Sequence, residues 1–194
     1  MTKIITIGRE FGSGGRTIGK AVAEKLGIPC YDYELLLKIA EESGLSEQFI
    51  QERAENSSVS SVVARGLSGL GKHSYTSTED YLWKIQKKVI TDIAAKESCV
   101  IIGRCADWLL SDKADCLRVF IYADVKKRAE RIVNVYGERK ESPEKRIKDK
   151  DKHRSTFYYL HTDMEWGNVH NYHICLDSGE LGIERCTDII ASLY

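Results

Sequence analysis

The sequence has little that would mark a membrane, secreted or metal-binding protein. Its 194 residues include only two prolines, no apolar run long enough to span a bilayer, and six cysteines without a C-x-x-C pair. The scattered cysteines, several within apolar runs, indicate free thiols in a reducing compartment and argue against a zinc site. The first residues read as a strand and not as a signal peptide, so we expect a cytoplasmic protein without membrane contact.

An excess of either charge is also missing, because 29 basic residues balance 29 acidic ones. Nucleic-acid and anionic-membrane binders usually carry a basic excess, so we expect no nucleic-acid partner and only local charge-driven binding. The length suits one domain with a sizeable core.

The most informative stretch is 3–20, where a strand pattern, a glycine cluster and a helical pattern follow one another. A β-branched run at Ile4–Ile7 indicates a buried strand. Glycines let the backbone curl so that N–H groups point inward, and the next helix adds its free N–H groups and positive dipole end. The pattern therefore predicts an anion-binding loop formed by Gly12, Ser13, Gly14, Gly15, Arg16 and Thr17.

Two alignments of this loop with the motif G-x-x-x-x-G-K-[ST] are available. If Gly14 is the second glycine, Gly15 replaces the lysine and Arg16 the hydroxyl residue. If Gly15 is the second glycine, Arg16 replaces the lysine and Thr17 provides the hydroxyl for Mg²⁺, but Glu10 stands where the first glycine belongs. We prefer the second alignment, because a cation must neutralise the β- and γ-phosphates. A glycine-rich turn without a ligand is the alternative.

Three polar residues follow predicted strands, where ligands of open α/β sheets bind. Asp32 follows a short strand at 29–31 and either faces a ligand or caps the next helix. Arg104 follows the buried strand at 99–102 and either faces the same edge or pairs with a carboxylate. Asp107 begins a helix, where an acidic residue in the first turn is favourable by itself.

The most basic stretch is a helix expected to begin at Pro143, with Ser142 as its cap. Spacings of four place three cations on one face of this helix, namely Arg146, Lys150 and Arg154. Asp149 and Asp151 are expected to point elsewhere. Such a run is typical of a solvated helix with alternating charges. A stripe of cations without an anion also suits closure over a polyphosphate.

Five predicted strands alternate with helices, at 4–7, 29–31, 99–102, 117–122 and 171–176. This order predicts an α/β fold with a five-stranded parallel, doubly wound sheet and right-handed crossovers. The serine- and glycine-rich segment 56–78 is expected to be either a mobile flap on the substrate side or disordered.

Together these motifs resemble the cytidylate kinase-like family, a branch of the P-loop nucleoside monophosphate kinases. The resemblance is carried by residues 5–16, 31–34, 101–107 and 151–154 and spans most of the chain. It implies a P-loop NTPase fold with one domain over 1–194. Within that domain the core would comprise 1–32, 98–137 and 171–194, the acceptor-side helical insert 33–97, and the lid 138–170.

The resemblance also implies transfer of the γ-phosphoryl group of ATP to a nucleoside monophosphate, cytidylate first, with small nucleotides as the only partners. Residues 12–17 would hold the donor phosphates, with Thr17 on Mg²⁺ and the catalytic cations Arg16, Arg146, Lys150 and Arg154. Lys152 would belong to the lid. The acceptor would lie near Asp32, Lys38, Arg104 and Asp107.

The chain departs from cytidylate kinases at three of these places. It has Gly15 and Arg16 where they have a lysine, Lys38 where they tend to have arginine, and Cys105 where they tend to have aspartate. Two other functions are therefore considered, a nucleotide-binding sensor without catalysis and a kinase for another small acceptor. The sequence does not indicate an oligomeric state.

Overall fold

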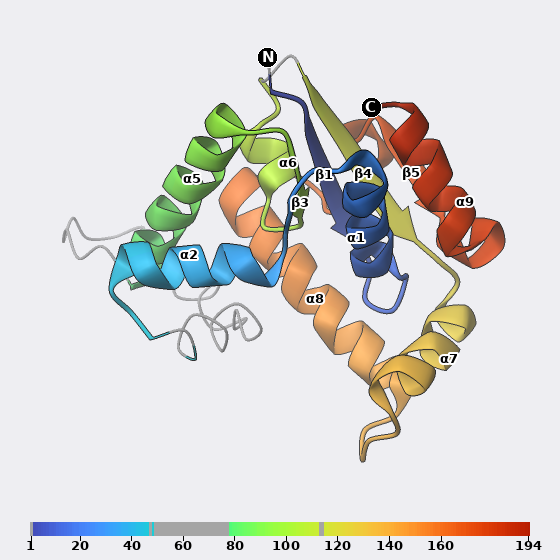
Figure 1. Cartoon of the computed structure of the whole chain (residues 1–194). Coiled ribbons are helices and arrows are strands. Elements are labelled where there is room, and N and C mark those ends of the chain that lie inside the picture. The colour runs from blue at the N-terminus through green and yellow to red at the C-terminus, as the bar shows by residue number, and fades with distance from the viewer. Residues whose placement is uncertain (1, 47, 49–77, 113–114) are drawn as a thin grey trace.

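The computed structural model describes residues 2–46, 48, 78–112 and 115–194, which form a parallel sheet flanked by helices (Figure 1). The strands pair in the order β2-β3-β1-β4-β5, and every pairing is parallel. Their bounds are β1 Ile4–Arg9, β2 Cys30–Tyr31, β3 Cys99–Ile102, β4 Cys116–Tyr122 and β5 Ile174–Asp177. The predicted doubly wound α/β sheet is confirmed.

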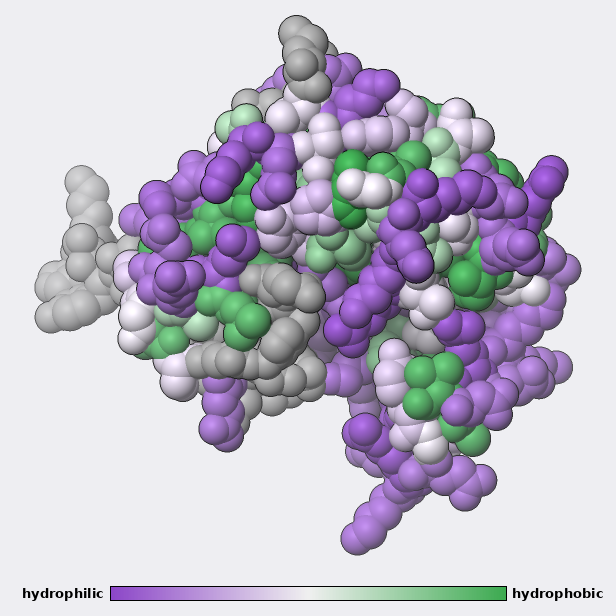
Figure 2. All heavy atoms as spheres, viewed as in Figure 1, coloured by the Kyte–Doolittle hydropathy of each residue, from purple (hydrophilic) through white to green (hydrophobic). Residues whose placement is uncertain are grey.

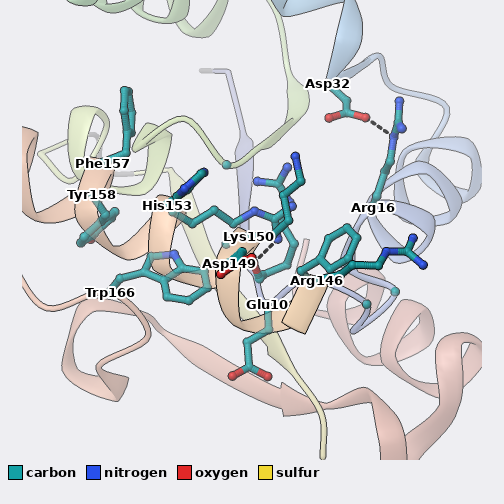
Figure 3. A pocket seen from close by; sticks show the side chains of 18 of the residues that line it. Glu10, Arg16, Asp32, Arg146, Asp149, Lys150, His153, Phe157, Tyr158 and Trp166 are labelled. Atoms are coloured by element: carbon teal, nitrogen blue, oxygen red, sulfur yellow. Dashed lines mark hydrogen bonds and ion pairs between the residues drawn. The ribbon is translucent and has the colours of Figure 1, made fainter. Parts of the chain in front are cut away.

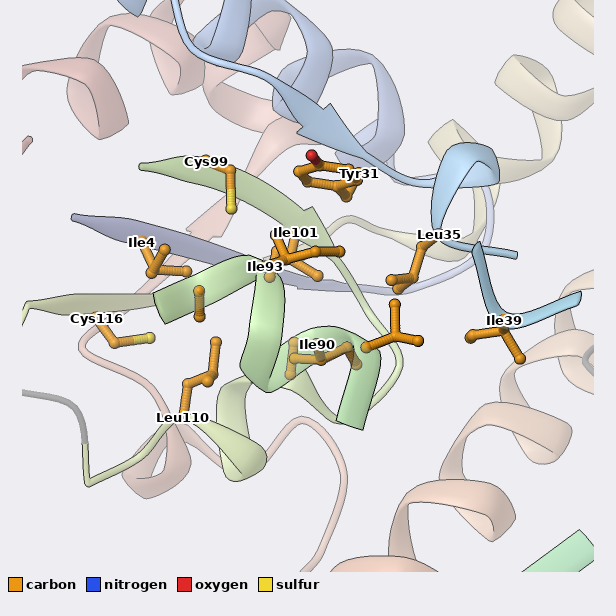
Figure 4. Packing of buried hydrophobic residues seen from close by; sticks show 13 residues of the cluster. Ile4, Tyr31, Leu35, Ile39, Ile90, Ile93, Cys99, Ile101, Leu110 and Cys116 are labelled. Carbon is orange, nitrogen blue, oxygen red and sulfur yellow. The ribbon is translucent and has the colours of Figure 1, made fainter. Parts of the chain in front are cut away.

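The two faces of the sheet bury two separate apolar clusters, because side chains alternate along the central strand β1. Ile5 and Ile7 pack under α1 (Gly15–Leu26) and α9 (Ser178–Ser192). Ile4 packs on the other face under α2 (Tyr33–Ser43), α5 (Thr78–Lys96) and α6 (Ala106–Leu109) (Figure 4). The ends of the parallel strands are thereby fixed between two helical layers.

Two further helices, α7 (Val125–Tyr136) and α8 (Pro143–Thr162), lie beyond the strand ends. Ser142 caps α8 by accepting a hydrogen bond from Lys145 N at 3.3 Å, as the sequence predicts. Figure 1 shows α8 crossing the molecule from α7 toward α5 and α6. At its far end His161 stacks on Trp83 of α5, with ring centroids 4.1 Å apart. The helix is therefore capped at its start and packed against α5 at its far end.

The last strand begins later than the sequence predicts. Residues Val169–Asn171 form a 3-10 helix, and β5 starts at Ile174. The Asn171 side chain donates a 2.7 Å hydrogen bond to the Glu165 carbonyl, which holds this residue in the preceding turn. The predicted mobile segment 56–78 lies outside the described residues except for Thr78, which begins α5. Among the described helices, none combines the length and the apolar character needed to cross a membrane.

Candidate active site

A cavity of about 520 Å³ lies at the carboxyl ends of the strands (Figure 3). Its walls come from the β1–α1 loop, the β3–α6 turn, and helices α7 and α8. Ligands of open α/β sheets bind at this edge, and the volume falls within the range of about 300–1,000 Å³ usual for ligand pockets. The cavity therefore brings together the loop and the strand ends that the sequence singles out.

The loop between β1 and α1 has a backbone that only glycine adopts readily. Gly12 and Gly14 have φ angles of 83° and 80°, and Gly14 is the N-cap of α1. A Cβ at Gly12 would lie 2.8 Å from Ile132 Cγ2, so the loop also passes too close to α7 for a side chain. The first N–H groups of α1 face this loop without partners within the helix, as an anion-binding loop requires.

Arg128 and Asp151 fix the first half of this loop. Phe11 N donates to Asp151 Oδ1 at 2.7 Å, and Arg128 Nη1 donates to Asp151 Oδ2 at 2.6 Å and to the Phe11 carbonyl at 3.2 Å. Asp151 belongs to α8, and Asp149 of the same helix lines the cavity. The prediction that both aspartates point away from the cation face is therefore wrong for Asp149, whereas Asp151 lies outside the cavity lining and binds the loop and Arg128.

Thr17 stands in the first turn of α1, and its hydroxyl accepts a 3.0 Å hydrogen bond from Arg131 Nη2. Mg²⁺ in such sites is usually held by one or two protein oxygens together with phosphates and water. In the structure the Thr17 oxygen faces the Arg131 guanidinium. Among the described residues no group of three or more His, Cys, Asp or Glu is placed to hold a metal ion.

Arg16 forms an ion pair with Asp32 across the mouth of the cavity (Figure 3). The side chain of Arg16 is 51% exposed and that of Asp32 is 14% exposed. Asp32 occupies the N-cap position of α2, but its side chain accepts no capping hydrogen bond. The prediction that Asp32 caps this helix with its side chain is therefore not fulfilled, and its carboxylate faces Arg16.

The turn after β3 is held in an unusual backbone conformation. Gly103, Arg104 and Cys105 have φ angles of 71°, 60° and 55° in succession. Such strain in residues other than glycine gathers at functional sites, where the surrounding structure maintains it. Gln86 of α5 contributes by donating a 3.0 Å hydrogen bond to the Arg104 carbonyl. The turn places Arg104 and Cys105 in the cavity wall.

Asp107 lies at the buried end of the cavity. It is only 4% exposed, and the Tyr158 hydroxyl donates a 2.7 Å hydrogen bond to its Oδ2. Burial raises the pKa of Asp107, and the hydrogen bond from Tyr158 opposes that rise. Figure 3 shows Phe157, Tyr158 and Trp166 gathered on this side of the cavity. A carboxyl group therefore lies among aromatic rings.

The predicted cation stripe of α8 faces the cavity. Arg146, Lys150 and Arg154 all line it, and Arg154 Nη1 donates a 3.0 Å hydrogen bond to the Arg9 carbonyl. On the side of the molecule drawn in Figure 2, hydrophilic residues cover much of the region where α7 and α8 lie. Two predicted cations lie outside the cavity lining. Lys152 is exposed on α8, and Lys38 Nζ lies 5.8 Å from the centre of the Tyr31 ring.

The structure adds functional candidates that sequence reasoning missed. Arg9 and Arg131 line the cavity on either side of the glycine loop, and Arg128 supports the loop from behind. The spacing of three between Arg128 and Arg131 was a usable signal, because it places both on one face of α7. No local pattern indicates Arg9, whose neighbours come from distant parts of the chain.

Comparisons with known proteins agree with this geometry. The model of the cytidylate kinase-like family matches residues 4–180. A cytidylate kinase from Archaeoglobus fulgidus is 26% identical over 189 residues, covering 96% of this chain and 91% of that protein. An uncharacterized protein from Eubacterium ventriosum has a TM-score of 0.73 at 27% identity, over 99% of this chain and 98% of that one.

A shikimate kinase from Acinetobacter baumannii, solved with shikimate, has a TM-score of 0.55 at 16% identity, over 100% of this chain and 93% of that chain. At that identity the likeness concerns the fold alone, which is the α/β fold of the P-loop NTPases. With the family match spanning nearly the whole chain, the protein belongs to the cytidylate kinase-like family and is a phosphotransferase of the nucleoside monophosphate kinase type.

Proposed function

We propose that the chain transfers the γ-phosphoryl group of ATP to a nucleoside monophosphate, with CMP or dCMP as the preferred acceptor. The main support is that one cavity connects the glycine loop with the buried Asp107–Tyr158 pair. A donor phosphate at one end and an acceptor at the other would meet among the cations in between. Phosphoryl transfer needs little beyond such positioning and charge neutralisation.

At the donor end, Gly12, Ser13, Gly14, Gly15, Arg16 and Thr17 would surround the phosphates with backbone N–H groups. Arg146, Lys150 and Arg154 approach the same space from α8 and would neutralise the transferred group. Thr17 would hold Mg²⁺, which when bound screens the charge of the phosphate oxygens. Docking of α8 on the loop would limit access of water, which competes with the acceptor.

At the acceptor end, the chemistry of the wall suits a pyrimidine base. The Asp107 carboxylate can accept a hydrogen bond from the amino group of cytosine. The rings of Phe157 and Trp166 offer flat apolar surfaces beside it. We place the acceptor phosphate near Arg104 and Asp32, with Lys38 as a more distant cation.

This assignment is tested by measuring ADP formation from ATP with a panel of nucleoside monophosphates and with shikimate as a non-nucleotide acceptor. We expect CMP or dCMP to accelerate turnover most. In Asp107→Leu, which cannot accept a hydrogen bond, the KM for CMP should rise about 100-fold, since the base would lose this acceptor. Asp107→Asn is the matched variant, because its amide oxygen still accepts, and its KM should rise about tenfold or less.

An unchanged KM for CMP in Asp107→Leu would contradict the proposed acceptor site. Native circular dichroism and an unchanged Kd for a non-hydrolysable ATP analogue serve as controls for folding. If shikimate or another small acceptor accelerates turnover and no monophosphate does, the cavity belongs to a kinase with a different acceptor.

One observation favours a second candidate, a nucleotide-binding sensor without catalysis. Neither Gly15 nor Arg16 provides the lysine ammonium of typical phosphate loops. Such a sensor would bind the ATP analogue in calorimetry and protect residues 56–78 from hydrogen exchange, yet no acceptor would stimulate ADP formation. Acceptor-dependent turnover would exclude it.

A further inference from the structure

We infer that Arg9, at the end of β1, provides the cation on the donor's β- and γ-phosphates that typical phosphate loops take from a lysine at the start of α1. This inference rests on the proposed use of a nucleoside triphosphate as donor. It assigns to a strand residue the charge that a lysine at the start of α1 would otherwise provide.

The stem of Arg9 and residue 15 compete for the same space. Gly15 is the first residue of α1 and the lysine position in one alignment of the loop. A Cβ built on Gly15 would lie 2.5 Å from Arg9 Cβ and 3.0 Å from Arg9 Cγ, closer than real side chains approach. The stem of Arg9 therefore occupies the space into which a side chain at position 15 would extend. Arg9 can follow this path only because residue 15 has no side chain.

The guanidinium of Arg9 ends beside the turn after β3. A Cβ on Gly103, at the end of β3, would overlap Arg9 Nη1. Gly103 N donates a 3.0 Å hydrogen bond to the Ile7 carbonyl, which keeps the two strand ends adjacent. Glycines at 15 and 103 thus leave a passage for Arg9, whose stem passes Gly15 of the glycine loop and whose planar group lies beside Gly103 in the cavity wall.

Arg9 lies among other cations. Arg154, Arg104 and Arg16 all act on Arg9 as like charges, whereas Asp32 acts on it as an opposite charge. Burial, followed by the charge of Arg154, lowers the pKa of Arg9. An anion bound beside these cations would offset their mutual repulsion, and a polyphosphate brings several negative charges. The planar fork of the Arg9 guanidinium also matches two phosphate oxygens at once.

Arg16 is placed differently. Its side chain is about half exposed and its guanidinium already forms an ion pair with Asp32. Arg9 lies deeper, between the loop and the end of β3. We therefore expect Arg9 to contribute more to donor binding and transfer than Arg16 does.

The test compares Arg9→Gln, Arg9→Lys and Arg185→Gln with the unmodified protein. Arg185 is an exposed arginine of α9 outside the cavity lining and serves as the matched control. In Arg9→Gln, calorimetry with a non-hydrolysable ATP analogue and Mg²⁺ should show a Kd about 10-fold to 100-fold higher, as for loss of one charged donor. Binding of AMP, which has no β- or γ-phosphate, should change about twofold or less. Arg9→Lys should recover part of the loss, and Arg185→Gln should match the unmodified protein.

A second set of variants tests the shared space. Gly15→Lys alone should weaken binding, because the new side chain collides with Arg9. Arg9→Gly alone should also weaken it, because the cation is gone. In the double variant Arg9→Gly/Gly15→Lys the lysine can enter the vacated passage, and affinity for the ATP analogue should rise about tenfold above that of Arg9→Gly. A merely structural role for Arg9 predicts no such recovery.

The inference is overturned if Arg9→Gln binds the ATP analogue within about twofold of the unmodified protein, or if AMP binding is lost to the same extent. Its failure differs from failure of the proposed function. If no acceptor stimulates turnover but Arg9→Gln still weakens the ATP analogue selectively, the role of Arg9 stands and the kinase assignment does not. If turnover occurs and Arg9→Gln leaves it intact, only the role of Arg9 is refuted.

Discussion

At the scale of single residues, Asp107 shows how one hydrogen bond controls the state of a buried carboxyl group. Burial raises its pKa, so the folded protein holds the Asp107 proton more tightly than the unfolded chain does. Stability from this group is therefore present at acidic pH and decreases as the pH rises through the raised pKa. The hydrogen bond from Tyr158 limits that decrease, because it stabilises the ionised form.

Tyr158→Phe should consequently destabilise the protein more at neutral than at acidic pH. We expect a loss of about 1–2 kcal/mol in the free energy of unfolding near neutral pH, where the buried carboxylate loses its donor. The loss should shrink toward acidic pH, where the carboxyl is protonated in both variants. Urea unfolding measured at several pH values checks this. Tyr159→Phe is the control, because Tyr159 is 58% exposed on the same helix, and equal losses in the two variants would contradict the account.

At the scale of elements, the contact between α8 and the glycine loop determines how the site is organised. Asp151 binds Phe11 N and Arg128 together, and the side chains of Arg128 and Asp151 are 7% and 18% exposed. At the other end of α8, His161 stacks on Trp83. With both attachments made, the helix that carries Arg146, Lys150 and Arg154 is held over the loop. Rearrangement on substrate binding is therefore expected mainly before α8, within residues 138–142.

Asp151→Ala should be strongly destabilising, because it leaves the buried Arg128 with Glu10, at 3.4 Å, as its remaining carboxylate partner. Breaking a buried ion pair from one side costs about 3 kcal/mol or more, measured as the free energy of urea unfolding. The matched control is Glu141→Ala, which breaks the pair with Lys145 at 2.8 Å between side chains 55% and 60% exposed. That loss should stay below about 1 kcal/mol. A comparable loss in both variants would show that the Asp151 contact does not hold α8 on the loop.

At the scale of the whole molecule, the sheet and the position of the loop followed from local patterns. β-branched runs predicted the strands, and their alternation with helical patterns predicted parallel pairing. The start of β5 was predicted too early because Asn171 is held by a contact with Glu165. The position of Asp151 could not be predicted from spacing, because the tertiary docking of α8 decides which of its faces meets the loop.

The path of the Arg9 side chain also depends on contacts between segments that are distant in the sequence. It requires glycines at 15 and 103, which become neighbours only once β1 and β3 pair. A pattern search that expects the cation within the loop therefore considers Arg16 and overlooks Arg9. Sequence thus predicted several of the segments that line the cavity, and the structure was needed to show that Arg9 passes between the loop and the end of β3.

The most direct test of phosphoryl transfer is phosphorus NMR of the protein incubated with ATP, Mg²⁺ and CMP. We predict that the ATP γ-phosphate signal decays while the two signals of CDP grow in equal amount, and that neither change occurs without protein. Decay of the ATP signal to inorganic phosphate at a rate that CMP does not alter, with no CDP formed, would contradict the account.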